Sequence, residues 1–188
     1  MIFNKHYDLE GQHAFLGASN YHWLNYEPEK LEEVYRNEKA KEYGTRLHEF
    51  ASTCINLGKK LEDNKSTLSL FVNDAITYKM DSEVVLYYSQ NCFGTADAIS
   101  FRRNLLRIHD LKTGSTKASE NQLKIYAALF CLEYKYKPKD IKIELRIYQN
   151  DTVRIYSPTP EDIYAIMKKI VAFNKQINKI NSEDIVDE

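Results

Sequence analysis

The chain has 188 residues, of which 43% are hydrophobic and 28% are charged. A chain of this length buries a sizeable core in one domain, and this composition excludes both an intrinsically disordered protein and an integral membrane protein. The formal net charge of −1 provides no overall attraction to a polyanion. Binding to nucleic acid would therefore depend on a local concentration of basic side chains.

The beginning of the chain and its cysteines predict a cytoplasmic protein without a membrane partner. The first residues, MIFNKHYDLEGQH, lack the basic start and apolar centre of a secretion signal. No apolar run approaches about eighteen residues, so no membrane span is expected. The three cysteines, Cys54, Cys92 and Cys131, are widely spaced and odd in number, which favours a reducing compartment over a disulfide framework.

The N-terminal part of the chain, about residues 19–80, is predicted to be helical. We predict four helices, over residues 20–26, 28–40, 42–60 and 66–80. Ser19 is a candidate N-cap for the first helix, which would end before Pro28. His48 borders the apolar stripe of the third helix, where a histidine is either a half-buried structural side chain or a functional one.

From residue 83 onward the sequence changes to the two-residue period and β-branched composition of strands. Five strands are predicted, over residues 83–90, 92–101, 105–113, 141–149 and 152–157. The first three form an antiparallel meander. Two helices, over residues 119–136 and 160–180, precede an acidic tail at 181–188. This order predicts a single domain, residues 1–188, of α/β (α+β) class, with a central mixed β-sheet flanked by helices.

The segment 94–126 carries the residues that point to chemistry. A turn at RRN, residues 102–104, joins two strands into a hairpin and returns Asp97 to the neighbourhood of the second strand. Side chains alternate along that strand, so Asp110 and Lys112 face the same side, about 6–7 Å apart. We therefore predict that the two acids and the lysine converge at a strand end.

Two carboxylates and a lysine in one place suit a divalent metal ion and hydrolysis of a phosphodiester. Mg²⁺ takes one or two carboxylates and keeps several waters, which matches Asp97 and Asp110. The backbone carbonyl of Leu111 is a further candidate ligand, and an imidazole ligand from His48 would make Mn²⁺ well tolerated. Lys112 would favour hydroxide and stabilise negative charge on the phosphate. Taken alone, an Asp-x-Lys pair on a strand is also an ordinary surface pair.

Basic residues are concentrated around these acids. Between residues 101 and 124, six basic side chains stand against two acidic ones. Phosphate binding needs a local bias of this kind, and an ordinary solvated surface can have the same composition. The candidates for contacts with nucleic acid are Arg102, Arg103, Lys117 and Lys124.

Several short motifs occur in order along the chain. They are GTRLH with His48, GTAD with Asp97, HDLKTG with Asp110 and Lys112, and QLKIY with Gln122 and Tyr126. This ordered set resembles the PD-(D/E)xK nuclease superfamily and, within it, the RecB-like and Cas4-like exonuclease branch with its phage-encoded members. The resemblance covers about residues 13–148.

The resemblance implies a restriction-endonuclease-like core and a Mg²⁺- or Mn²⁺-dependent deoxyribonuclease, an exonuclease of phage or bacterial recombination, repair or DNA end processing. The metal ligands that it implies are His48, Asp97 and Asp110. Lys112 would be the catalytic lysine, and Gln122 and Tyr126 would position the DNA strand or the water and the lysine. Glu49 is a candidate accessory acid.

The chain departs from this branch in its cysteines. Many members of the branch hold an iron–sulfur cluster on four cysteines, three of them near the C-terminus. This chain has three cysteines and none after Cys131, so no iron–sulfur cluster is expected. It also lacks a GxxxxGK[ST] motif, so an unwinding motor would be a separate recombination or helicase partner. The alternative is a catalytically inactive nucleic-acid-binding or protein-interaction module on the same fold.

Overall fold

The computed structural model describes residues 4–184. Its contacts divide the chain into two compact units, Met1–Tyr43 and Gly44–Glu188. The first unit holds two short 3₁₀ segments, η1 (Tyr7–Leu9) and η2 (Ala18–Asn25), and the beginning of helix α1 (Pro28–Asn56). The predicted short helix near residues 20–26 is therefore 3₁₀ in form. Its N-cap is Gly17 and not Ser19, because the chain is already turning at Ala18.

The helices predicted over 28–40 and 42–60 form one continuous helix, α1. The separation into two was wrong, because the chain stays helical across the predicted boundary at residue 41, where Lys39 pairs with Glu42 one turn later over 2.9 Å. Gly44 lies within this helix, at a position of close packing. A Cβ on Gly44 would lie 2.8 Å from Thr113 Oγ1. Glycine lowers helix stability by about 1 kcal/mol relative to alanine, and here its small size allows this close approach.

A five-stranded mixed sheet forms the centre of the second unit, which confirms the predicted fold class. Its strands, in spatial order, are β1 (Asp81–Ser89), β2 (Cys92–Arg102), β3 (Leu105–Leu111), β4 (Lys142–Gln149) and β5 (Thr152–Tyr156). The pair β3–β4 is parallel and the other three pairs are antiparallel. The predicted meander of the first three strands is confirmed.

Two-residue turns set the register of two of the antiparallel pairs. Arg103 and Asn104 join β2 to β3 with φ of 50° and 59°, and Asn150 and Asp151 join β4 to β5 with φ of 52° and 55°. Positive φ at both positions matches the twist of the strands that such a turn connects, and asparagine and aspartate tolerate this region better than most residues. Both turns lie where the sequence predicts them.

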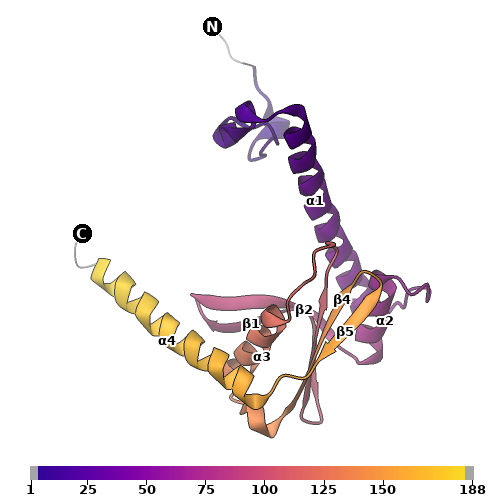
Figure 1. Ribbon diagram of the computed structural model, residues 1–188, viewed down its shortest axis with the longest axis vertical. Helices are drawn as coiled ribbons and strands as arrows, with labels where there is room; N and C mark the ends of the chain where they lie inside the picture. The colour runs from indigo at the N-terminus through magenta and orange to yellow at the C-terminus, as the bar shows by residue number, and fades with distance from the viewer. Residues whose placement is uncertain (1–3, 185–188) are drawn as a thin grey trace. The chain divides into compact units, whose positions relative to one another are not determined.

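Helices cover the sheet on both faces (Figure 1). Helices α3 (Asn121–Glu133) and α4 (Pro160–Asp184) pack on one face, against Leu106, Ile108 and Leu145. Helix α2 (Thr67–Thr77) and the C-terminal part of α1 pack on the other face, against Leu111 and Tyr148. The alternation of side chains along β3 therefore places Asp110, which follows the period of Leu106 and Ile108, on the α3 face.

The last helix extends further than predicted. Residues 181–184 of the predicted acidic tail belong to α4, and residues 185–188 lie outside the described residues. Within the part of the chain that the structure describes, no helix is long and apolar enough to cross a membrane.

The assignment of sheet faces predicts the stability effect of two truncations. Leu145 is fully buried in the layer between the sheet and α3, whereas Ile155 on β5 is 56% exposed. Leu145→Ala should lower the free energy of unfolding by about 2–5 kcal/mol, because it removes buried methyl groups and leaves a cavity. Ile155→Ala should change it by no more than about 1 kcal/mol. Urea denaturation of both variants measures the difference, and equal losses would contradict the assignment.

Candidate functional site

The hairpin of β2 and β3 brings two acidic side chains together. Asp97 lies in the middle of β2, where its carboxylate accepts a hydrogen bond from the backbone N–H of Leu111 over 2.8 Å. Leu111 is the last residue of β3 and follows Asp110 directly. The side chain of Asp97 therefore binds the end of β3, and the predicted convergence of Asp97 with Asp110 is observed.

Asp110 is 2% exposed, and its carboxylate is only half satisfied. Oδ1 accepts a hydrogen bond from Lys112 Nζ over 3.0 Å, whereas Oδ2 is buried and has no hydrogen-bond partner among the described residues. Burial, together with the negative charge of Asp97, raises the pKa of Asp110 to about 6, and Lys112 offsets only part of this effect. A buried acceptor without a donor is costly, so the site favours a cation at this oxygen.

Lys112 connects Asp110 to helix α3. Besides its contact with Asp110, its ammonium donates a hydrogen bond to Gln122 Oε1 over 2.9 Å. Gln122 Nε2 in turn donates to the hydroxyl of Tyr126 over 3.0 Å. The sequence spacing of four between Gln122 and Tyr126 places them on one stripe of α3, as predicted. This chain of hydrogen bonds holds the lysine in a defined position.

The absence of a side chain at Gly94 leaves space for the ring of Tyr126. A Cβ at Gly94 would lie 2.9 Å from Tyr126 Cε1, closer than unbonded carbon atoms approach each other. The GTAD segment therefore contributes both the acid, Asp97, and the space that the tyrosine ring needs above β2.

His48 reaches the same site from helix α1. Its Nδ1 lies 3.5 Å from Asp97 Oδ2, and this contact raises the pKa of His48 although burial lowers it. Glu83 on β1 completes the group: one ligand atom from each of His48, Glu83 and Asp97 lies within 4.8 Å of the others. Asp110, which the sequence predicts as a ligand, is outside this group of three, although the charges of Asp97 and His48 both affect its pKa.

This donor set fits Mg²⁺ or Mn²⁺. Carboxylate oxygens are the ligands that Mg²⁺ prefers, and an imidazole suits Mn²⁺ better than Mg²⁺. The buried, unpartnered Oδ2 of Asp110 is the oxygen most in need of a positive partner. The predicted ligand role of the Leu111 carbonyl stays a prediction.

Sequence reasoning missed Glu83. It lies near the start of β1, in a backbone conformation with φ of 53°, which is uncommon for residues other than glycine. Burial and the charge of Asp97 raise the pKa of Glu83. No spacing motif connects Glu83 to the other acids, and only the pairing of β1 with β2 brings them together. The sequence therefore gives no signal for the role of Glu83.

Glu49 is exposed and lines an open pocket of about 480 Å³ together with His48 and Glu83. The candidate accessory acid therefore borders the metal ligands without belonging to them.

The predicted nucleic-acid-binding residues fall into two groups. Lys117 is exposed in the loop between β3 and α3, and Lys124 on α3 pairs with Glu120 over 3.4 Å. Both lie in the segment that follows Lys112. Arg102 and Arg103 lie instead at the β2–β3 turn, at the other end of β3 from Asp110. The seven residues of β3 therefore separate the two groups, and the role of all four in binding nucleic acid stays a prediction.

One protein family matches the chain over residues 76–176, which is just over half of its length, and it is described as "Protein of unknown function (DUF2800)". The chain belongs to the DUF2800 family. The DUF2800 match includes Glu83, Asp97, Asp110 and Lys112 but begins after His48. Searches of curated proteins and of solved structures found no match.

The raised pKa of Asp110 predicts a pH-dependent stability of the metal-free protein. Because the folded state holds this proton more tightly than the unfolded chain, ionisation of Asp110 destabilises the fold. The penalty is absent below the unfolded pKa of 3.8 and complete above the folded pKa of about 6.

Asp110→Asn removes this ionisation and keeps the side chain's size. In EDTA, we expect the stability of the variant relative to wild type to rise by up to about 3 kcal/mol between about pH 4 and pH 7. Chemical denaturation of both proteins across this range is the measurement. A relative stability that does not change with pH would contradict the buried, partly unsatisfied carboxylate.

Proposed function

We propose that this protein is a Mg²⁺- or Mn²⁺-dependent deoxyribonuclease that hydrolyses phosphodiester bonds, acting as an exonuclease in phage or bacterial recombination, repair or DNA end processing. The observation that carries the proposal is the buried carboxylate of Asp110, which has one oxygen on Lys112 and one without a partner, beside a second acid, Asp97. The ordered motifs that resemble the PD-(D/E)xK nucleases support the same reaction, and the choice of exonuclease rests on that resemblance alone.

His48, Glu83, Asp97 and Asp110 would hold the metal ion. When bound, such an ion neutralises phosphate charge and lowers the pKa of a coordinated water. The protein supplies the fixed positions of the ligands: Asp97 is held by the backbone N–H of Leu111, and Asp110 by the ammonium of Lys112.

Lys112 would act on the scissile phosphate. An ammonium group has three donors, and two of them are used by Asp110 and Gln122. The third remains for an oxygen of the phosphate, where a fixed positive charge stabilises the negative charge that develops during hydrolysis.

Gln122 and Tyr126 act as positioning residues. Neither is charged at neutral pH, and their hydrogen bonds limit the rotamers that Lys112 can adopt. A catalytic group that is already oriented reacts without losing conformational freedom in the transition state, so this support favours turnover and not binding.

The charge arrangement favours an active enzyme over an inactive module on the same fold. Two acids next to each other, one of them buried, destabilise a protein unless a cation offsets their charge. A module that only binds DNA or protein has no physical need for this arrangement. Metal binding separates the two functions, because calorimetry with Mn²⁺ should give a binding heat for the nuclease and none for the module.

Removing the lysine or the acid should abolish cleavage. With end-labelled linear DNA and Mg²⁺ or Mn²⁺, we expect Lys112→Ala and Asp110→Ala each to lower the cleavage rate by about 10²–10³-fold or more, the cost of losing one preorganised electrostatic group. Lys175→Ala changes an exposed lysine on α4 and serves as the control. Equal activity in the three variants would refute the proposal.

Gln122→Ala should separate positioning from metal binding. We expect kcat to fall by roughly tenfold, because Lys112 loses one of its two restraints. The affinity for Mn²⁺ should stay at the wild-type value, since Gln122 contacts none of the candidate ligands. Gln176→Ala, an exposed glutamine of α4, is the matched control. A loss of Mn²⁺ affinity in Gln122→Ala would show that the residue supports the fold of the site and not the lysine.

A further inference from the structure

A second cavity lies at the other end of the sheet. It has a volume of about 1070 Å³ and is formed by the end of α2, the β2–β3 turn and the start of β4. The basic residues that line it are Lys79, Arg102, Arg103, Arg107, Lys139 and Lys142. One acid, Asp140, is among its lining residues. Positive charge of this density in a concave surface attracts anions.

Most of this positive charge is not neutralised by the protein. Within residues 4–183, the side chains of Lys79, Arg103, Lys139 and Lys142 form no ion pair and no hydrogen bond. Arg102 donates a hydrogen bond to the backbone carbonyl of Lys79 over 3.4 Å, which leaves its charge without a counter-ion. The cavity thus presents cations that lack partners, in contrast to the surface of α1, where lysines and arginines pair with glutamates.

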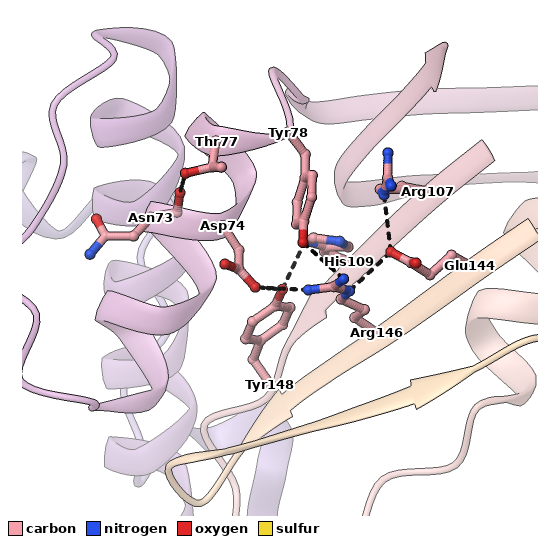
Figure 2. Close-up of polar contacts among 9 residues, drawn as sticks. All are labelled: Asn73, Asp74, Thr77, Tyr78, Arg107, His109, Glu144, Arg146 and Tyr148. Atoms are coloured by element: carbon pink, nitrogen blue, oxygen red, sulfur yellow. Dashed lines mark hydrogen bonds and ion pairs between the residues drawn. The ribbon is translucent and has the colours of Figure 1, made fainter. Parts of the chain in front are cut away.

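Hydrogen bonds and ring contacts connect the side chains at the back of the cavity. Figure 2 shows a network of polar side chains between α2, β3 and β4, with Tyr78 inside it and Arg107 at its edge. Arg107 Nε donates to Glu144 over 3.0 Å, and its guanidinium lies over the ring of Tyr78, 4.5 Å from the centroid. Its two terminal nitrogens make no hydrogen bond among the described residues, so they remain available to a ligand.

Arg146 contacts Tyr78 as well. Its guanidinium lies over the same ring at 4.7 Å, and it donates to the hydroxyl of Tyr78, to Asp74 and to Glu144, each over 3.0 Å (Figure 2). Tyr148, which is fully buried, donates to Asp74 over 2.7 Å. The network holds Tyr78 and Arg107 in place before any ligand arrives, so little side-chain entropy is lost on binding.

We infer that this cavity binds phosphate groups of a nucleic-acid backbone, at a site separate from the candidate nuclease centre. Six cations from three chain segments exceed what one phosphate requires and suit several phosphates in a row. From Leu105, the first residue of β3, to Asp110 the strand measures roughly 17 Å, and Arg107 and Asp110 lie on opposite faces of the sheet, so the two sites contact different parts of one strand or different molecules. The inference does not depend on the nuclease activity, because it concerns binding in the absence of metal.

Charge reversal of two exposed lysines tests the site. With EDTA present, binding of a labelled DNA duplex of about 20 base pairs is compared at about 50–200 mM salt for wild type, Lys139→Glu/Lys142→Glu and the control Lys168→Glu/Lys175→Glu. The control makes the same change in net charge on α4, where both lysines are exposed. We expect the affinity of the cavity variant for DNA to fall at least tenfold, and that of the control less than about threefold. In the cavity variant, the magnitude of the slope of log K against log salt should fall by about 2.

Inorganic phosphate distinguishes the source of the anion. Titration of inorganic phosphate into the three proteins, followed by calorimetry, reports occupancy of the cavity by a free anion. If phosphate binding is lost in the cavity variant while DNA binding is not, the cavity takes a free phosphate and the backbone assignment is overturned. If neither ligand distinguishes the cavity variant from the control, the site itself is refuted.

Arg107→Gln, which keeps a hydrogen bond to Glu144 possible, should also weaken DNA binding. This variant checks that Arg107 contacts the nucleic acid.

Discussion

Burial of Asp110 beside Asp97 is the electrostatic constraint on which the candidate site depends. Transfer of a carboxylate out of water is costly, and a neighbouring negative charge adds to the cost. Lys112 offsets part of it through Oδ1, and Oδ2 is left buried without a partner. Neighbouring residues fix the other two charged groups: the backbone N–H of Leu111 donates to Asp97, and Gln122 accepts a hydrogen bond from Lys112. A divalent cation would offset the negative charge of both carboxylates at once.

Strand β3 links the two functional regions proposed for the molecule. Asp110, near the C-terminal end of β3, faces α3 and belongs to the acidic site. Arg107, near the beginning of β3, faces α2 and lines the basic cavity. Because side chains alternate along a strand, one short element serves both faces without mixing their charges. The parallel neighbour β4 supplies Glu144 and Arg146, which hold Arg107 and Tyr78 in place. The same strand pair therefore positions Asp110 on one face and Arg107 on the other.

Local patterns in the sequence were sufficient to predict the mixed sheet, its two tight turns and the convergence of Asp97, Asp110 and Lys112, because alternation and turn chemistry act over few residues. Features that depend on distant packing could not be predicted in this way. The close approach of Thr113 to Gly44 joins residues that are far apart in the sequence, and no local pattern indicates it. Glu83 joins the site only through the pairing of β1 with β2, and the distance of the β2–β3 turn from the acids follows from the length of β3.

We propose that His48, Asp97 and Asp110 share one divalent cation. A crystal soaked in Mn²⁺ and measured at the manganese absorption edge tests it directly, because anomalous scattering locates the ion independently of the refined side chains. We expect a single strong peak within bonding distance of the carboxylates of both Asp97 and Asp110, and none in a crystal of Asp110→Asn. A peak bound only by acids outside this group, such as Glu49, or no peak next to Asp110, would contradict it.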